Sequence, residues 1–181
     1  MGFYEGSSGQ HGFLYVDATF TTLADFPGAV GRTVAFGLNN SGQIVGSYSF
    51  QSGGSHGFLY DQGEFTTLDV PFSGANNTGA RGINDVGEIV GNYGDLNGQH
   101  GFLYAAGDFT ALNMPGADTG TTTVLGINNS GQIVGIYEDH PPQSAGGPRA
   151  STLSHKFVSS IIMAIARRRR WPCYVPGIRY S

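Results

Sequence analysis

Two short motifs recur along the chain with the same spacing. The motif His-Gly-Phe-Leu-Tyr begins at His11, His56 and His100, and the motif Gly-x-Ile-Val-Gly begins at Gly42, Gly87 and Gly131. Because unrelated motifs share a period of 44 or 45 residues, the chain is an array of similar units and not one irregular domain. Each unit must bury its apolar surface against its neighbours, and this limits the chain to stacked or radial architectures.

The composition favours short strands over helices. The chain of 181 residues contains 30 glycines, 12 phenylalanines and 9 tyrosines, and only 12% of its residues are charged. The glycines recur at fixed positions of the unit and are therefore part of its design. Aromatic and β-branched residues between regularly placed glycines predict short strands joined by tight turns.

The second copy predicts two hairpins. The first contains a strand at 56–60, a turn at 61–64 and a strand at 65–70 that ends before Pro71. We expect 72–80, which varies most among the copies, to be a loop. The second hairpin then covers 81–93 around the turn at 85–87.

Asparagines and glycines occupy matching places in the second hairpins. We expect the asparagines to form their turns through side-chain to backbone hydrogen bonds. The first glycine of each motif is expected to take the left-handed conformation. Glycines within strands, such as Gly57 and Gly91, are expected to let neighbouring sheets approach closely. The structural repeat positions are Asn39, Asn84 and Asn128, then Gly42, Gly87 and Gly131, then Gly46, Gly91 and Gly135.

The predicted fold class is all-β. Four short strands in about 45 residues match one blade of a β-propeller. We expect residues 1–139 to form a partial propeller-like array of about three four-stranded antiparallel blades, with copies that start near 11, 56 and 100. Residues 140–181 are expected to be a linker and a basic, non-repeated tail that is irregular or weakly helical.

Charge separates these two regions. The repeat region carries all thirteen acidic residues with only Arg32 and Arg81, whereas the residues from 140 onward carry seven basic residues and no acid. An acidic repeat region argues against nucleic-acid binding. The apolar stretch 157–166 before four arginines is too short to span a bilayer, and we do not expect it to bind membranes.

Targeting and cysteine content add little. The single cysteine, Cys173, excludes an intrachain disulfide and a cysteine-based zinc site. The first residues show neither a basic start nor an apolar stretch, so no signal peptide is visible.

The two motifs resemble those of the HAF family of bacterial repeat proteins, named for a His-Ala-Phe triplet. Here the triplet reads His-Gly-Phe at His11, His56 and His100, and Ile83-Asn84 followed by Gly87-x-Ile-Val-Gly91 is similar to the accompanying block of the family. The resemblance covers about residues 2–137. It implies an extracellular or cell-surface protein with propeller-like blades, and it implies no catalytic residues.

Several residues could carry chemistry. His11, His56 and His100 could ring a metal ion, but we expect each to make a structural hydrogen bond at a blade edge. The asparagine turns could bind calcium, but they hold too few carboxylates. Asp25 and Asp69, with Asn113 at the matching place, resemble solvated surface more than a glycosidase pair. We therefore expect no cofactor and no enzymatic activity.

The leading functional prediction is a binding or scaffold module for a glycan or a protein. Tyr48, Tyr93 and Tyr137 are expected to be exposed and to join the variable loops in binding. One alternative is a gene fragment without independent function, because Gly2–Gly6 matches the end of a copy. A second alternative is a polysaccharide-active enzyme. We also expect self-association through exposed end blades.

Overall fold

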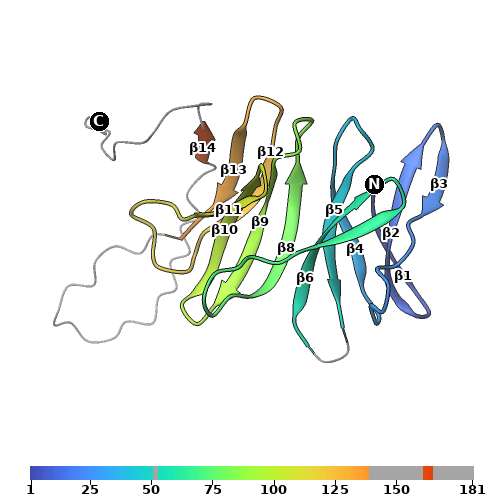
Figure 1. The fold of residues 1–181 in the computed structure, drawn as a ribbon, viewed down its shortest axis with the longest axis horizontal. Coiled ribbons are helices and arrows are strands. Elements are labelled where there is room, and N and C mark those ends of the chain that lie inside the picture. The colour runs from blue at the N-terminus through green and yellow to red at the C-terminus, as the bar shows by residue number, and fades with distance from the viewer. Residues whose placement is uncertain (51–52, 139–160, 165–181) are drawn as a thin grey trace, which may run out of the picture.

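The computed structural model describes residues 1–50, 53–138 and 161–164 (Figure 1). Every helix or strand in these residues is a β-strand, and the strands form four antiparallel sheets that follow one another along the chain. The prediction of an all-β fold is therefore confirmed. The described part of the chain holds no helix that could cross a membrane.

Strands that are neighbours in sequence are also neighbours within each sheet. The first sheet contains β1 (Gly2–Gly6), β2 (Gly9–Val16) and β3 (Thr19–Thr22). The second contains β4 (Thr33–Leu38), β5 (Ile44–Ser49), β6 (Ser55–Asp61) and β7 (Glu64–Leu68). The third contains β8 (Asn76–Ile83), β9 (Ile89–Asp95), β10 (Gly98–Ala105) and β11 (Asp108–Leu112). The fourth contains β12 (Thr123–Ile127), β13 (Gln132–Ile136) and β14 (Ile161–Ala164).

Cross-strand pairs show which strands are equivalent. Gly46 on β5 pairs with Phe58 on β6, and Gly91 on β9 pairs with Phe102 on β10. Gly2 on β1 pairs with Phe13 on β2 in the same manner. The strand β1 therefore holds the place in the first sheet that β5 and β9 hold in the second and third.

The predicted first hairpin is confirmed in the second copy. Strands β6 and β7 are joined by Gln62 and Gly63, whose φ angles are 48° and 96°. Positive φ at both central residues is the two-residue turn whose twist matches that of a hairpin.

The expected loop at 72–80 is shorter than predicted. Strand β8 begins at Asn76 and pairs with β9, so the loop prediction is wrong for residues 76–80. The pairing register shifts between Asn76 and Gly79 and again between Ala80 and Gly82. Such bulges break the alternation of side chains that identifies a strand in a sequence.

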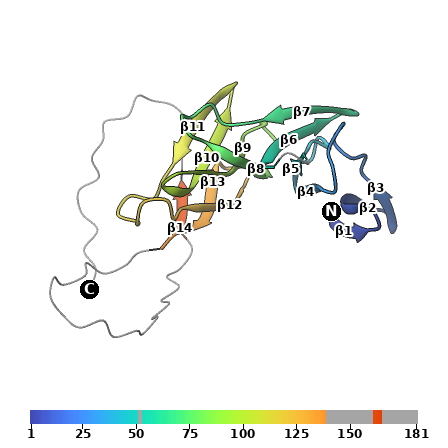
Figure 2. The same ribbon diagram turned by 90° about the horizontal axis from the view of Figure 1, so that it is seen from below.

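The second, third and fourth sheets pack face to face through their apolar side chains, and Figure 2 shows the four sheets in succession. Val45 of the second sheet shares a core cluster with Ala80 and Phe102 of the third. Val90 of the third sheet shares a cluster with Val124 of the fourth.

Glycines bring the first strands of the sheets close together. A methyl group at Gly37 on β4 would lie 2.9 Å from the Cα of Gly82 on β8. A methyl group at Gly82 would lie 3.1 Å from the Cα of Gly126 on β12. Both distances are below ordinary van der Waals contact, so any side chain at Gly37 or Gly82 would move the adjacent sheet.

The motif glycines act differently from the expectation. A methyl group at Gly91 would collide with the carbonyl oxygen of Gly79 and lie 2.7 Å from the Phe102 ring, and both belong to its own sheet. The space at Gly91 therefore accommodates an aromatic ring of the same sheet, not a neighbouring sheet. At Gly57 a methyl group would lie 2.6 Å from the carbonyl oxygen of Leu68 in its own sheet, and only in ordinary contact, at 3.5 Å, with the backbone nitrogen of Ala80 in the next sheet. The expectation of a close approach between sheets is therefore not met at Gly57 either.

One segment of the expected tail belongs to the fourth sheet. Strand β14 pairs with β13, and Ile161 lies opposite Gly135, the place that Phe58 and Phe102 hold in the second and third sheets. The prediction of an irregular or weakly helical tail is therefore wrong for residues 161–164. The remainder of that prediction, 140–160 and 165–181, lies outside the described residues.

Candidate functional site

The motif histidines are tied to the ends of the hairpins. Each histidine donates a hydrogen bond from Nδ1 to a side-chain oxygen that lies just beyond the following strand. The pairs are His11–Asp25 at 2.9 Å, His56–Asp69 at 2.8 Å and His100–Asn113 at 2.9 Å. The predicted structural hydrogen bond is therefore present in all three copies.

The partners of these histidines were not found from the sequence. Asp25 and Asp69 were interpreted as solvated surface, but they hold the chain where it leaves the hairpin. A usable signal existed, because each histidine is followed 13 or 14 residues later by an aspartate or asparagine. Such a side chain can accept from an imidazole N–H whichever of the two residues is present.

His100 has a second partner. Its Nε2 lies 3.1 Å from a carboxylate oxygen of Asp95, and the histidine is buried. The backbone N–H of Asn97, followed by His100, lowers the pKa of Asp95 below its ordinary value. Among the described residues no group of three or more His, Cys, Asp or Glu side chains is placed to hold a metal ion.

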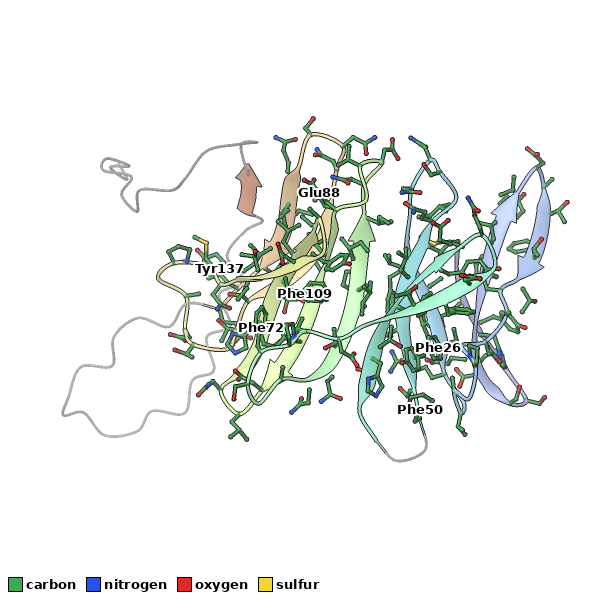
Figure 3. The ribbon with its side chains drawn as sticks, in the orientation of Figure 1. Phe26, Phe50, Phe72, Glu88, Phe109 and Tyr137 are labelled. Carbon is green, nitrogen blue, oxygen red and sulfur yellow. The ribbon has the colours of Figure 1, made fainter. Side chains whose placement is uncertain are left out.

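Two of the tyrosines expected at the surface are buried. Tyr48 is 2% exposed and Tyr93 is 6% exposed, so the expectation of exposure is wrong for both. The ring of Tyr48 stacks on Phe26 with centroids 3.6 Å apart, and Figure 3 shows Phe26 and Phe50 beside the second sheet. Tyr93 lies 5.2 Å from the ring of Phe72. The loops before β4 and β8 fold back and place these phenylalanines on the tyrosines.

Tyr137 is half-buried and follows β13. It lines an apolar pocket between the third and fourth sheets together with Leu112 and Met114. Met114 occupies the loop position that Phe26 and Phe72 hold, since the carbonyl oxygen of each of the three residues accepts a hydrogen bond from the backbone N–H of an alanine three residues later. Tyr137 is therefore part of the packing between sheets.

Each turn asparagine organises its own hairpin as predicted. The Oδ1 of Asn84 accepts from the backbone N–H groups of Val86 and Glu88, at 3.2 and 2.9 Å. Asn39 and Asn128 accept the equivalent pairs of bonds. Gly87 has a φ of 81°, and Gly42 and Gly131 have φ angles of 79° and 75°, which confirms the left-handed conformation.

The same asparagines also join adjacent sheets. The Nδ2 of Asn39 donates to the carbonyl oxygen of Asn84 at 3.1 Å, and the Nδ2 of Asn84 donates to the carbonyl oxygen of Asn128 at 3.3 Å. This row of hydrogen bonds, here called the asparagine ladder, links the second, third and fourth sheets at one end. The sequence indicated the turns but not the ladder, because a motif within one unit carries no sign of contacts between units.

Asp85 strengthens the ladder at the next position. Its carboxylate accepts from the backbone N–H and the Nδ2 of Asn40, at 2.9 and 2.7 Å, and from the Nδ2 of Asn129 at 2.7 Å. The hydrogen bonds from Asn40, followed by that from Asn129, lower the pKa of Asp85. The ionised form of Asp85 is therefore the form that joins the three sheets.

The first sheet presents aromatic side chains whose equivalents in the second and third sheets are buried or half-buried. We call this surface the aromatic face, and it consists of Tyr4, Phe13, Tyr15 and Phe20. Tyr4 aligns with Tyr48 and Tyr93 but is 42% exposed, and Phe20 is 69% exposed. Phe20 packs on Tyr15 at 4.6 Å and on Phe13 at 5.4 Å, so these three rings form one continuous patch, and Tyr4 lies on the same face with its ring 5.5 Å from that of His11. The sequence alone does not reveal this surface, because the exposure of a repeated residue depends on which neighbour covers it.

Comparisons with known proteins do not identify a relative. The chain matches no family model, and neither curated proteins nor solved structures give a significant match.

Proposed function

We propose that this chain is a non-enzymatic repeat module with a propeller-like array of sheets. It is located outside the bacterial cell or at its surface, and it binds a protein through the aromatic face. The observation that carries this proposal is the exposure of Tyr4, Tyr15 and Phe20, because the matching rings of the second and third sheets lie in packed clusters. Large exposed apolar patches on soluble proteins commonly mark interaction sites.

Two features support the propeller-like and non-enzymatic parts of this proposal. The second and third sheets are four-stranded, antiparallel and packed face to face in chain order, as the blades of a propeller are. The recurring polar side chains are engaged in structural hydrogen bonds, as at His56 with Asp69 and Asn84 with Asn128. The resemblance to HAF repeats motivates the extracellular location.

The form of the aromatic face favours a protein over a glycan. Its rings are tilted against one another, at 45° between Tyr15 and Phe20 and at 62° between Phe13 and Phe20. A patch of mutually packed edges and faces resembles the core of a protein interface, in which aromatic residues are enriched. Sugar binding instead combines a flat ring with convergent polar groups.

Site-specific photo-crosslinking tests the proposal. A benzophenone amino acid replaces Phe20 in the full chain produced by its native bacterium, and whole cells are irradiated. We expect an adduct that is sensitive to protease and contains a second polypeptide. The same amino acid at Leu96, which is 97% exposed in the turn between β9 and β10, serves as the matched control.

Three results would contradict the proposal. An adduct sensitive to glycosidase but not to protease would make a glycan the ligand. Equal yields at positions 20 and 96 would show that the aromatic face has no preference for a partner. Retention of all of the protein in the cytoplasm would refute the extracellular location.

A further inference from the structure

The fourth sheet lies at the opposite end of the array from the first sheet (Figures 1 and 2). It carries a second exposed apolar surface. We call it the aliphatic face, and it consists of Val134 and Ile136 on β13. Val134 aligns with Val45 and Val90, which are both 0% exposed, but is itself 39% exposed. Ile136 is 46% exposed, at the place where the interior sheets hold the buried polar residues Ser47 and Asn92. Each end of the array therefore exposes positions that are buried in its interior.

The interior of the array shows what these surfaces pack against. In the cluster between the second and third sheets, Val45 and Leu59 contribute one side, and Tyr93, Phe102, Tyr104 and Phe109 contribute the other. Val45 and Val134 hold the same place in their sheets, and Phe109 and Phe20 hold the same place in theirs. The aliphatic face thus matches one side of an interface within the chain, and the aromatic face matches the other.

We propose that the partner of the aromatic face is the aliphatic face of a second copy of this chain, so that copies associate head to tail. The inference rests on the proposed function and names its protein partner. A contact between two different surfaces of the same chain leaves one of each surface free, and it therefore continues into rings or linear assemblies. The contact repeats the type of packing that already joins the second and third sheets.

Complementary variants of the full chain test the inference. Phe20→Glu removes the aromatic face, and Val134→Glu removes the aliphatic face. In sedimentation velocity we expect the wild-type mass to rise with protein concentration beyond that of a dimer. Each variant alone should lose at least about tenfold in association constant, since a charge in an apolar contact is unfavourable.

Mixing the two variants gives the decisive result. Val134→Glu keeps an aromatic face and Phe20→Glu keeps an aliphatic face, so an equimolar mixture should form a heterodimer that grows no further. Leu96→Glu, which alters neither face, should associate like the wild type. Circular dichroism confirms that each variant is folded, and Phe20→Ser with Val134→Ser replaces the pair if a glutamate variant unfolds.

Other outcomes would overturn the inference. Dimers of Val134→Glu alone would show that aromatic faces pair with each other. A wild-type chain that stays monomeric up to millimolar concentration would show that copies do not associate. In either case a crosslink from position 20 to a different polypeptide would leave the proposed function standing, and the absence of any polypeptide adduct would refute it separately.

Discussion

Removal of one ladder asparagine measures how strongly the sheets are joined. Asn84→Ala deletes four hydrogen bonds: two accepted by Oδ1 and two donated by Nδ2, to Asn128 at 3.3 Å and to Glu88 at 2.6 Å. Figure 3 shows Glu88 at the turn end of the sheets. Asn84 is 2% exposed, so water can replace few of these bonds without rearrangement of the turn.

The magnitude follows from the number of bonds. A hydrogen bond contributes about 1 kcal/mol to the free energy of unfolding, and a bond to a charged carboxylate contributes more. Val86 is exposed, so its freed N–H can bond water. We therefore expect Asn84→Ala to lower the free energy of unfolding by about 3 kcal/mol, a large part of the stability of a typical domain.

Asn128→Ala is the matched control. Asn128 makes the same three bonds within its own turn, but it is exposed. Among the described residues its Nδ2 donates no ladder bond to a further sheet. We expect a loss of about 1 kcal/mol, because water replaces most of what is removed. Urea unfolding followed by circular dichroism gives both values. Equal losses for the two variants would refute a stabilising role for the ladder.

Three further predictions concern glycine packing, pH and a buried hydroxyl. Gly82→Ala should destabilise the fold by about 1–3 kcal/mol, because the added methyl group contacts the fourth sheet. At Gly126 a methyl group would lie 3.8 Å from its nearest neighbour, the Val134 side chain, so Gly126→Ala should stay within about 0.5 kcal/mol of wild type. Thermal unfolding measures both variants. The ionised Asp85 has a lowered pKa, so its stabilisation is present above the ordinary carboxyl pKa and is lost as the pH falls through the folded pKa. Asp85→Asn should therefore flatten the loss of stability below about pH 4 in acid titration, and an unchanged curve would contradict this assignment. Tyr48→Phe should lower the free energy of unfolding by about 1 kcal/mol, because the Tyr48 hydroxyl forms a hydrogen bond with Thr67 at 2.9 Å. Tyr93→Phe should be neutral, because Ala111 occupies the place of Thr67 in the third sheet. Equal effects of the two variants in urea unfolding would contradict a stabilising role of the Tyr48 bond.

The sequence predicted those parts of the fold that are determined within one unit. The hairpin of β6 and β7, the left-handed glycines and the turn-forming role of Asn84 are local, so the motif residues specify them directly. The first residue of β8 is difficult to predict from the sequence, because the bulges in this strand remove the alternation of buried and exposed residues. The strand at 161–164 carries no copy of the His-Gly-Phe motif.

The candidate sites depended on contacts between units and were predicted less well. The burial of Tyr48 requires Phe26, which comes from a loop before another strand. Phe20 is exposed, whereas Phe65 and Phe109 at the same place in the second and third sheets pack against apolar clusters formed with other segments of the chain. A repeated motif determines which side chains each unit has available for contacts. The arrangement of the units determines which of these contacts form.

The hydrogen bonds around Asp85 also restrict the order in which units can stand. A unit with asparagine at this position is a suitable neighbour for one with aspartate, as Asn40 and Asn129 demonstrate on its two sides. Two aspartate units in succession would place carboxylates side by side and repel. Gene duplication could therefore change the number of units freely, but it would retain only those arrays in which acidic units are separated by amide units.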